Sequence, residues 1–438
     1  MKKIILIIIV IFYIVVKTAP VYSQGASLHG IGAVNEGMAG TATGAAVDAA
    51  GALQWNSASI SALKNSEISI GLGLGIPSMS VSSKLPDILG GYGGGTTDGE
   101  PGAVPLPSMA LVKKTEGSRF TWGLLMGVVG GSRLNYKGCG LDETDPNFNP
   151  ILTPQSSSYT GYGSLNADIQ MLQVAPTLSF QVTEKLSVGL APTISMANIS
   201  CHPLYLVQSE ELTSDVHNPQ YYIDPSGTGT RWAWGAGFQI GVYYDTGCGW
   251  AFGASYKSRQ WLEDFRYNII HEPKDGTDPT YVETIKVDLD YPDIISFGFS
   301  YNGLERWLFA CDFRYFLNNE VKGFPHLGWK NVFGFSFGIQ HELTQRLTLR
   351  GGYSFNENPV PDECARDNVA SPLIQQHGLY LGASFKMTHN LGLHVAYSHM
   401  FKSTVEGDYF GSNTQFPGGY VKSTVSCDTL MASFSVGF

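Results

Sequence analysis

The chain has 438 residues, of which 15% are charged and 12% aromatic, and its net charge is −10. An acidic chain without a basic stripe excludes nucleic-acid recognition. The six cysteines are widely spaced and form no Cys-x-x-Cys pair, which argues against a metal site, and we expect no cofactor. No Pro/Ser linker or charge run divides the chain, which favours one large domain after the N-terminal segments.

Residues 1–23 are predicted to be a secretory signal peptide. Lys2 and Lys3 form its positive end, Ile4–Val16 its apolar run, and Val21-Tyr22-Ser23 a plausible cleavage site. The apolar run is too short to span a bilayer, which needs about 20 apolar residues. The mature chain is therefore expected to begin near Gln24 in an exported compartment.

Residues 24–63 differ from the rest of the chain, because Gly and Ala dominate and no apolar alternation is present. Short helical turns such as Val47–Leu53 are possible in this segment. Its small side chains would let a compact plug fit inside a barrel, whereas a disordered leader is the alternative that the composition leaves open.

From Glu67 onward, alternating segments recur about fourteen times, as the even strand number of bacterial outer-membrane barrels requires. Apolar residues alternate with small or polar ones, which predicts strands with one face toward lipid. Examples are 295–301, 333–339 and 379–385. Tight connections such as 183–185, 245–247, 344–346 and 388–390 alternate with long ones at 135–163, 201–229 and 356–376, as periplasmic turns and outer loops do.

The last nine residues alternate without a break and end on an aromatic side chain, Phe438. This ending is typical of an outer-membrane barrel strand. We expect residues 64–438 to form an all-β transmembrane barrel in the outer membrane, in contact with its lipid and with the barrel-assembly machinery through the strand that ends in Phe438.

Three segments resemble the FadL/TodX (OmpP1) family of outer-membrane transporters for long-chain fatty acids and hydrocarbons. They are the glycine-rich start from Gly30 to Ala58, the strand pair containing Trp329-Lys330-Asn331 and Leu343–Tyr353, and the loop Asn358–Glu363. The resemblance covers essentially the whole mature chain. It implies a fourteen-stranded barrel with residues 24–63 as a luminal hatch.

The resemblance also implies two local features. The family's hatch usually carries Asn-Pro-Ala where this chain has Asn56-Ser57-Ala58, so this chain lacks the proline that imposes a rigid turn there. A kink in the family's third strand opens a lateral gap, and its counterpart is the run that contains Gly127, Gly130 and Gly131. Glycines that merely face a crowded lumen are the alternative interpretation.

Several basic residues fall on the inward side if the apolar face is outward. A buried cation needs a partner, so each is half of an ion pair, for example with Asp312, or a contact for an anionic ligand. The candidates are Arg231, Lys257, Arg259, Arg314, Lys330 and Arg350. Lys330 matches a lysine that holds the fatty-acid carboxylate in the family.

A second basic residue that the family leads one to expect is absent, and Cys201-His202 stand in its place. This departure leaves room for a neutral ligand. In the following loop, Leu204 and Leu206 could line an outer groove that captures an aliphatic tail, or they could form the core of the loop. Disulfides among Cys139, Cys201 and Cys364 and isolated thiols both remain open.

The predicted function is passive uptake of hydrophobic compounds, most of all long-chain fatty acids, and the chain is not expected to be an enzyme. A general porin, a structural or adhesive barrel and a channel for neutral hydrocarbons are the alternatives. Ser214, Asp215 and His217 are close in sequence only, which does not define a catalytic triad. Asp142, Glu143 and Asp145 lack the spacing of a calcium loop and predict a solvated surface.

Overall fold

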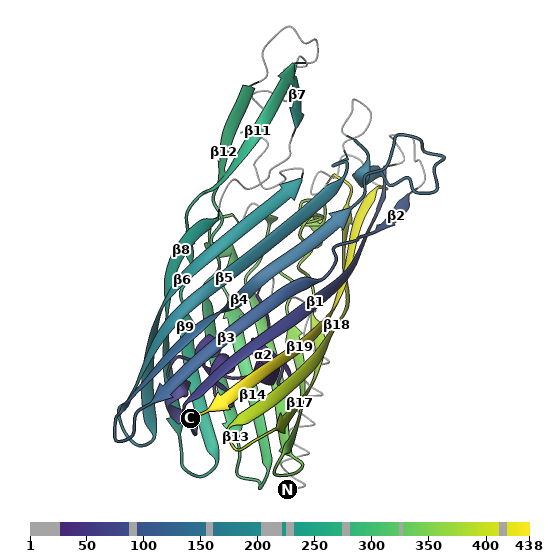
Figure 1. Ribbon diagram of the computed structural model, residues 1–438. Helices are drawn as coiled ribbons and strands as arrows, with labels where there is room; N and C mark the ends of the chain where they lie inside the picture. Colours follow the sequence, from purple (N-terminus) through teal and green to yellow (C-terminus); the bar gives the residue numbers. More distant parts are fainter. Residues whose placement is uncertain are drawn as a thin grey trace.

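The computed structural model describes residues 27–86, 94–154, 161–202, 221–224, 232–273, 281–323, 327–410 and 418–438. Fourteen antiparallel strands form a closed barrel, in which β1 pairs with β19 and β8 pairs with β9 (Figure 1). In chain order they are β1 (Glu67–Lys84), β3 (Val104–Lys114), β4 (Phe120–Tyr136), β5 (Leu165–Gln181), β6 (Leu186–His202), β8 (Ala233–Asp245), β9 (Trp250–Lys257), β13 (Ile294–Tyr301), β14 (Trp307–Phe316), β15 (Val332–Glu342), β16 (Leu347–Asn356), β17 (His377–Lys386), β18 (Leu391–Asp408) and β19 (Tyr420–Gly437). The predicted fold class is confirmed.

Short strands extend the barrel at its long-loop end. β2 (Gly95–Asp98) pairs with β1, and β10 (Trp261–Leu262) pairs with β8. Above them, β7 (Tyr221–Asp224), β11 (Phe265–Pro273) and β12 (Tyr281–Val287) form a separate small sheet (Figure 1). Tight turns and the C-terminus lie at the opposite end of the barrel. Short 3-10 helices occur at Ser59–Ala62, Pro150–Leu152, Asn318–Glu320 and Asp362–Cys364.

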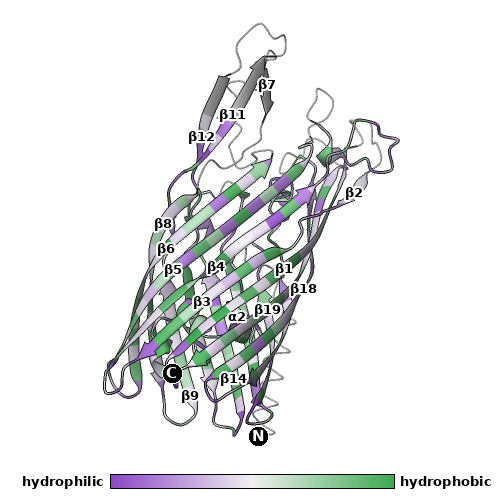
Figure 2. Ribbon diagram, in the orientation of Figure 1, coloured by the Kyte–Doolittle hydropathy of each residue, from purple (hydrophilic) through white to green (hydrophobic). Residues whose placement is uncertain are grey.

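The alternation of each strand separates an apolar outer face from a small-residue inner face. In β1, Ile70, Leu72 and Leu74 are exposed, whereas the glycines between them face inward. Apolar residues therefore alternate along the strands in Figure 2, and the outward ones form a band suited to lipid. Phe120, Trp250 and Trp307 are exposed beside the tight turns, where a girdle of aromatic residues belongs.

The N-terminal segment lies inside this barrel. We call residues 27–63 the hatch; it contains α2 (Gly32–Glu36) and α3 (Ala49–Trp55). Between Gly30 and Ile60 every residue except Ala46 and Val47 is buried. The predicted helical turn at 47–53 is observed two residues later, where Asp48 caps α3 by accepting a hydrogen bond from the Gly51 amide. Among the described residues, no helix is long and apolar enough to cross a membrane.

Candidate functional site

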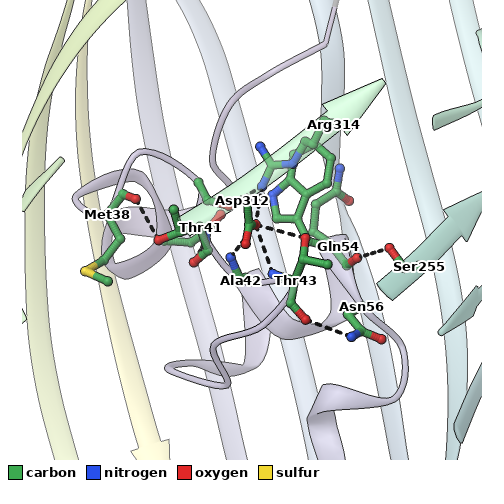
Figure 3. A network of polar contacts seen from close by, with 12 residues as sticks. Met38, Thr41, Ala42, Thr43, Gln54, Asn56, Ser255, Asp312 and Arg314 are labelled. Carbon is green, nitrogen blue, oxygen red and sulfur yellow. Dashed lines mark hydrogen bonds and ion pairs between the residues drawn. The ribbon is translucent and has the colours of Figure 1, made fainter. Parts of the chain in front are cut away.

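One buried carboxylate attaches the hatch to the barrel wall. Asp312 of β14 accepts hydrogen bonds from the backbone N–H groups of Ala42 and Thr43 at 2.9 and 3.0 Å, and from the Thr43 hydroxyl at 2.9 Å (Figure 3). The Arg314 guanidinium, also buried, lies 2.9 Å from the same carboxylate oxygen and donates to the Gly40 carbonyl. The predicted pairing of inward cations with Asp312 is thus realised by Arg314.

Trp55, at the end of α3, lies against two of the predicted luminal cations. The Arg314 guanidinium carbon is 3.4 Å from the centre of the indole ring, and the Lys257 ammonium is 5.9 Å from it. Lys257 is buried and donates to the Gln173 side chain at 3.3 Å. Both cations therefore help hold the hatch in place.

Asn56 shapes the turn in which this chain lacks the family's proline. Its amide nitrogen donates to the carbonyls of Thr43 and Val242, at 2.8 and 3.0 Å, and its side-chain oxygen accepts from the Ala58 N–H at 3.0 Å. Asparagine closes such turns by bonding to the backbone two residues along. The Asn56-Ser57-Ala58 turn is consequently fixed by side-chain hydrogen bonds to both the hatch and the wall.

Inward glycines let the hatch backbone touch the wall. A methyl group added to Gly253 of β9 would lie 1.8 Å from the Thr43 carbonyl oxygen, and one added to Gly298 of β13 would lie 2.7 Å from the Gly44 nitrogen. On the other side of the lumen, one added to Gly382 of β17 would lie 3.0 Å from the Gly37 Cα. Glycine is needed wherever two backbones approach this closely.

Two titratable side chains, the half-buried His29 and the buried Glu36, lie near the start of the hatch, outside the membrane-spanning strands. Burial, with the nearby Arg314 charge, lowers the pKa of His29 to about 3, against a hydrogen bond to Asn356 that raises it. Burial raises the pKa of Glu36, although its carboxylate accepts a 2.6 Å hydrogen bond from the Ser398 hydroxyl. His29 is therefore neutral at neutral pH, and both side chains line a cavity.

The barrel wall has a window between β3 and β4. The ladder between these strands ends at the pair Ser108 and Gly127, and it resumes only where the Glu100 N–H donates to the Asn135 carbonyl at 2.8 Å. Between these limits, residues 104–107 stay paired to β1 but not to β4. Two of them, Pro105 and Pro107, have no N–H to donate to a neighbouring strand.

The β4 side of this window is the predicted glycine run. The register between β4 and β5 shifts between Val128 and Gly130, which is a β-bulge at Val129. The described start of the hatch occupies this free edge: Ser27 forms an isolated bridge with Gly130, and the Leu28 N–H donates to the Val129 carbonyl at 3.1 Å. One short piece of chain thus covers the inner side of the window.

Two adjoining cavities share the glycine run of β4. The first, which we call the wall cavity, has about 1130 Å³, including the part open to solvent, and the second, the inner cavity, about 610 Å³. Both are lined by Gly130, Gly131 and Leu373. The linings are mainly apolar and include Met79, Leu106, Val128, Met400 and Met431 in the wall cavity and Ile199, Phe265, Leu289, Leu327 and Trp329 in the inner cavity.

The wall cavity extends through the window. Its lining includes Met400 and Ser398, which face the lumen, and also Gln170 of β5. The even-numbered residues of β5 point out of the barrel, as the exposure of Asn166, Pro176 and Leu178 shows. A space bounded by both sets of side chains connects the lumen with the outer face of the wall.

The remaining predicted site residues that the structure describes are not brought together at these cavities. Arg259 donates to Asp293 at 2.9 Å, and Arg350 donates to Gln340 at 2.8 Å and to Ser384. Lys330 is exposed in the connection before β15 and, like the other predicted cations among the described residues, does not line either cavity. Its predicted carboxylate role stays a prediction. Arg231, Leu204 and Leu206 lie outside the described residues, as do the signal peptide, Gln24 and the Ser214, Asp215 and His217 group.

The acidic loop residues and the cysteines have local structural contacts where the structure describes them. Asp142 and Asp145 each accept a hydrogen bond from the backbone N–H two residues further along. All six cysteines belong to the described residues and are free thiols.

The sequence analysis identified Gly127, Gly130 and Gly131 on the β4 side of the window. It missed Arg133 and the residues of β3 that form the other side. Arg133 belongs to the wall-cavity lining and pairs with Asp168. The β3 side could have been recognised from Pro105 and Pro107, which are two residues apart within an apolar strand segment. A strand with two missing donors on one edge is a poor partner for its neighbour.

Comparisons with known proteins agree with this architecture. A family model described as outer membrane protein transport protein (OMPP1/FadL/TodX) matches residues 14–436. The chain is 17% identical to the toluene transporter TodX of P. putida (TM-score 0.70), covering 94% of this chain and 99% of that one. It is 16% identical to the toluene transporter TbuX of Ralstonia pickettii (TM-score 0.64; 94% and 99% covered) and 14% identical to a FadL homologue of Pseudomonas aeruginosa (TM-score 0.66; 95% and 100% covered). Comparison with curated proteins gives no match.

Proposed function

This chain belongs to the OMPP1/FadL/TodX family of outer membrane transport proteins, and from that premise we propose that it lets hydrophobic small molecules cross the outer membrane passively, through the inner cavity, the wall cavity and the window. The observation that carries the proposal is the wall cavity, whose mainly apolar lining runs from the lumen to the outer face of β5. A molecule that follows it reaches lipid without crossing the periplasmic end of the barrel.

The proposed route begins at the outer loops, where Leu204 and Leu206 are the predicted capture residues, and continues into the inner cavity. To pass on, the ligand displaces only the start of the hatch, because Ser27 and Leu28 hold the free edge of β4 by backbone contacts. Release then occurs between β3 and β4 into the lipid. No energy source is required, since a hydrophobic solute moves down its own concentration gradient.

Two classes of ligand are considered. If Lys330 binds a carboxylate, the ligand is a long-chain fatty acid; in the alternative, it is a neutral hydrocarbon. The described lining favours the neutral ligand. The inner cavity has Asp290 as its charged side chain, and the one cation among the described wall-cavity residues, Arg133, already lies 2.6 Å from Asp168. The toluene transporters TodX and TbuX have the same fold, which is compatible with either ligand.

The deciding experiment is equilibrium binding of a labelled long-chain fatty acid to the refolded barrel in a bilayer disc. An aromatic hydrocarbon serves as competitor, Lys330→Gln as the test variant and Lys386→Gln, an exposed lysine of β17, as its matched control. Binding weakened only by Lys330→Gln establishes carboxylate recognition. Displacement by the hydrocarbon without a Lys330 effect establishes a neutral-ligand channel, and absence of binding by both molecules refutes the transport proposal.

A second experiment tests the route. Gly130→Trp places a large side chain in the lining of both cavities, so uptake should stop while the barrel still assembles. Gly351→Trp in β16 is the control, because Gly351 lines neither cavity. Unchanged uptake by the Gly130 variant would exclude the lateral exit.

The general porin is the competing function, and the hatch argues against it. A water-filled pore needs an open lumen, whereas residues 30–60 are packed against strands on several sides of this barrel. A barrel in a planar bilayer should therefore show little small-ion conductance; a persistently open pore would favour the porin. Contacts of Phe438, exposed at the end of the chain, with the barrel-assembly machinery remain a prediction.

A further inference from the structure

A single side chain spans the upper part of the window. Arg133 of β4 donates through Nε and one terminal nitrogen to Asp168 of β5, at 2.9 and 2.6 Å. Its other terminal nitrogen points across the window to the carbonyl of Ala103, at 3.4 Å, in the connection that leads into β3. The guanidinium therefore joins the two sides of an opening that no backbone ladder closes.

The position of Arg133 distinguishes it from an ordinary ion pair between neighbouring strands. It belongs to the lining of the wall cavity, and its side chain is 30% exposed. Asp168 is itself oriented by the Gln170 amide, which donates to its second oxygen at 3.1 Å. An Arg–carboxylate pair held at two nitrogens has a fixed direction, so the remaining guanidinium nitrogen is aimed at Ala103.

This pair lies where the apolar outer band ends. On the outward face of β5, Leu178, Pro176, Val174 and Leu172 are followed by Gln170, Asp168 and Asn166, so the side chains change from apolar to polar within one strand. A guanidinium at this boundary can reach the polar head-group region while its aliphatic part stays against the hydrocarbon. The lower part of the window therefore opens to lipid tails, and Arg133 stands at its upper limit.

We propose that Arg133 is a strut that sets the aperture of the window and thereby the largest molecule that can leave through the wall. The inference rests on the proposed lateral route and adds a specificity-determining residue to it. Its physical basis is that two contacts hold this connection to β4. The Arg133 guanidinium bonds to the Ala103 carbonyl, and three residues before Ala103 the Glu100 N–H donates to the Asn135 carbonyl. Without the strut, residues 101–103 can move away from β4, because residues 104–107 are paired to β1 only, and Pro105 and Pro107 offer β4 no N–H.

The test compares a small and a bulky probe on the full-length protein in lipid vesicles. Uptake of a single-ring aromatic hydrocarbon and of a four-ring fused hydrocarbon is measured for wild type, Arg133→Ala and Arg133→Lys. The ratio of bulky to small uptake should rise about two- to fivefold in Arg133→Ala, as expected for loss of a partly exposed ion-pair contact. Arg133→Lys should lie between the two, because an ammonium group cannot reproduce the fixed fork of a guanidinium.

Lys137→Ala is the matched control. Lys137 forms an exposed ion pair with Glu100 at 3.6 Å beside the window, but it does not line the wall cavity. Its ratio should equal that of wild type. Asp168→Asn provides a second variant with almost unchanged volume, which frees the guanidinium from β5 and should also raise the ratio.

The outcomes separate this proposal from the route on which it rests. An unchanged ratio in Arg133→Ala and Asp168→Asn, with uptake of both probes still blocked by Gly130→Trp, refutes the strut and leaves the lateral route standing. Uptake that survives Gly130→Trp refutes the route and the strut together. Equal gains in Arg133→Ala and Lys137→Ala would show a general loosening of the wall and would also overturn the proposal.

Discussion

Replacing Asp312 with alanine should release the middle of the hatch from the barrel wall. The carboxylate accepts three hydrogen bonds from Ala42 and Thr43 and is paired with Arg314, whose side chain is 2% exposed. Removing one partner of a buried ion pair costs about 3–5 kcal/mol, because the other charge is left buried and unpaired. We take about 3 kcal/mol as the loss of docking free energy, since Arg314 keeps its bond to the Gly40 carbonyl and its contact with Trp55.

Amide hydrogen exchange measures this loss directly. If the Ala42 and Thr43 amides exchange through local release of the hatch, a loss of about 3 kcal/mol raises their exchange rates about 150-fold, at about 1.4 kcal/mol for each factor of ten. Asp428→Asn, a substitution on the outer face of β19, is the control that should leave both amides protected. Exchange in Asp312→Ala within about threefold of wild type, which is about 0.7 kcal/mol, would refute the assignment of Asp312 as the anchor.

Two further perturbations act on the same docking equilibrium. Gly253→Ala should prevent close docking and raise small-ion conductance, because the new methyl group would lie 1.8 Å from the Thr43 carbonyl oxygen; Gly351→Ala, whose methyl group has its nearest neighbour at 3.6 Å, should not. Acidification should weaken docking through His29, because its pKa is about 3 in the docked hatch and near the usual value of 6.5 when the hatch is released, so docked His29 binds fewer protons. The docking free energy from His29 is complete above about pH 7.5 and falls by about 2 kcal/mol by pH 5. Asp48 has the opposite effect on docking, because burial raises its pKa to about 6 and acid then favours the docked hatch. The test is therefore the difference in small-ion conductance between wild type and His29→Gln across this pH range. Equal acid sensitivity of the two proteins would count against His29.

The barrel could be predicted because its signal is local. Each strand position faces either lipid or lumen, so the predicted runs at 295–301, 333–339 and 379–385 fall within β13, β15 and β17. The hatch could be predicted as a compact luminal segment from its small residues and the family resemblance. The glycine run predicted to bend the third barrel strand does contain a bulge, at Val129.

The candidate site could not be completed from the sequence because its contacts join distant segments. Ser27 meets Gly130, and Arg133 reaches Ala103, through pairings that no local period encodes. The inward cations show the same limit. Alternation places Arg314 in the lumen. Only the fold shows that it pairs with Asp312 and packs on the Trp55 ring, and so helps hold the hatch. Lys330 lies in a connection and not in a strand, so alternation carries no information about its direction.

The strength of the hatch anchors limits what a ligand can move. Binding shifts a conformational equilibrium only by the difference in the ligand's affinity for the two states. Expelling the whole hatch would break the Asp312 network, the Asn56 turn and the glycine contacts with several strands at once. The hydrogen bonds among these contacts contribute about 1 kcal/mol each, and those to the charged Asp312 more, so expelling the whole hatch costs several kcal/mol more than releasing its first residues.

The start of the hatch is a much smaller obstacle. Ser27 and Leu28 are held at the window by the isolated bridge to Gly130, in which the Leu28 N–H donates to the Val129 carbonyl at 3.1 Å, and by the contact of the Ser27 hydroxyl with Tyr291. A ligand that fills the wall cavity competes with Leu28, which packs against the apolar cluster that contains Leu106 and Val128. Local release of Ser27 and Leu28 is thus within reach of hydrophobic binding, at about 25 cal/mol for each Å² of apolar surface buried. Ligand-enhanced exchange confined to the Leu28 amide, with Ala42 and Thr43 still protected, is the result that this reasoning requires; simultaneous exchange of all three would mean that the hatch moves as one body.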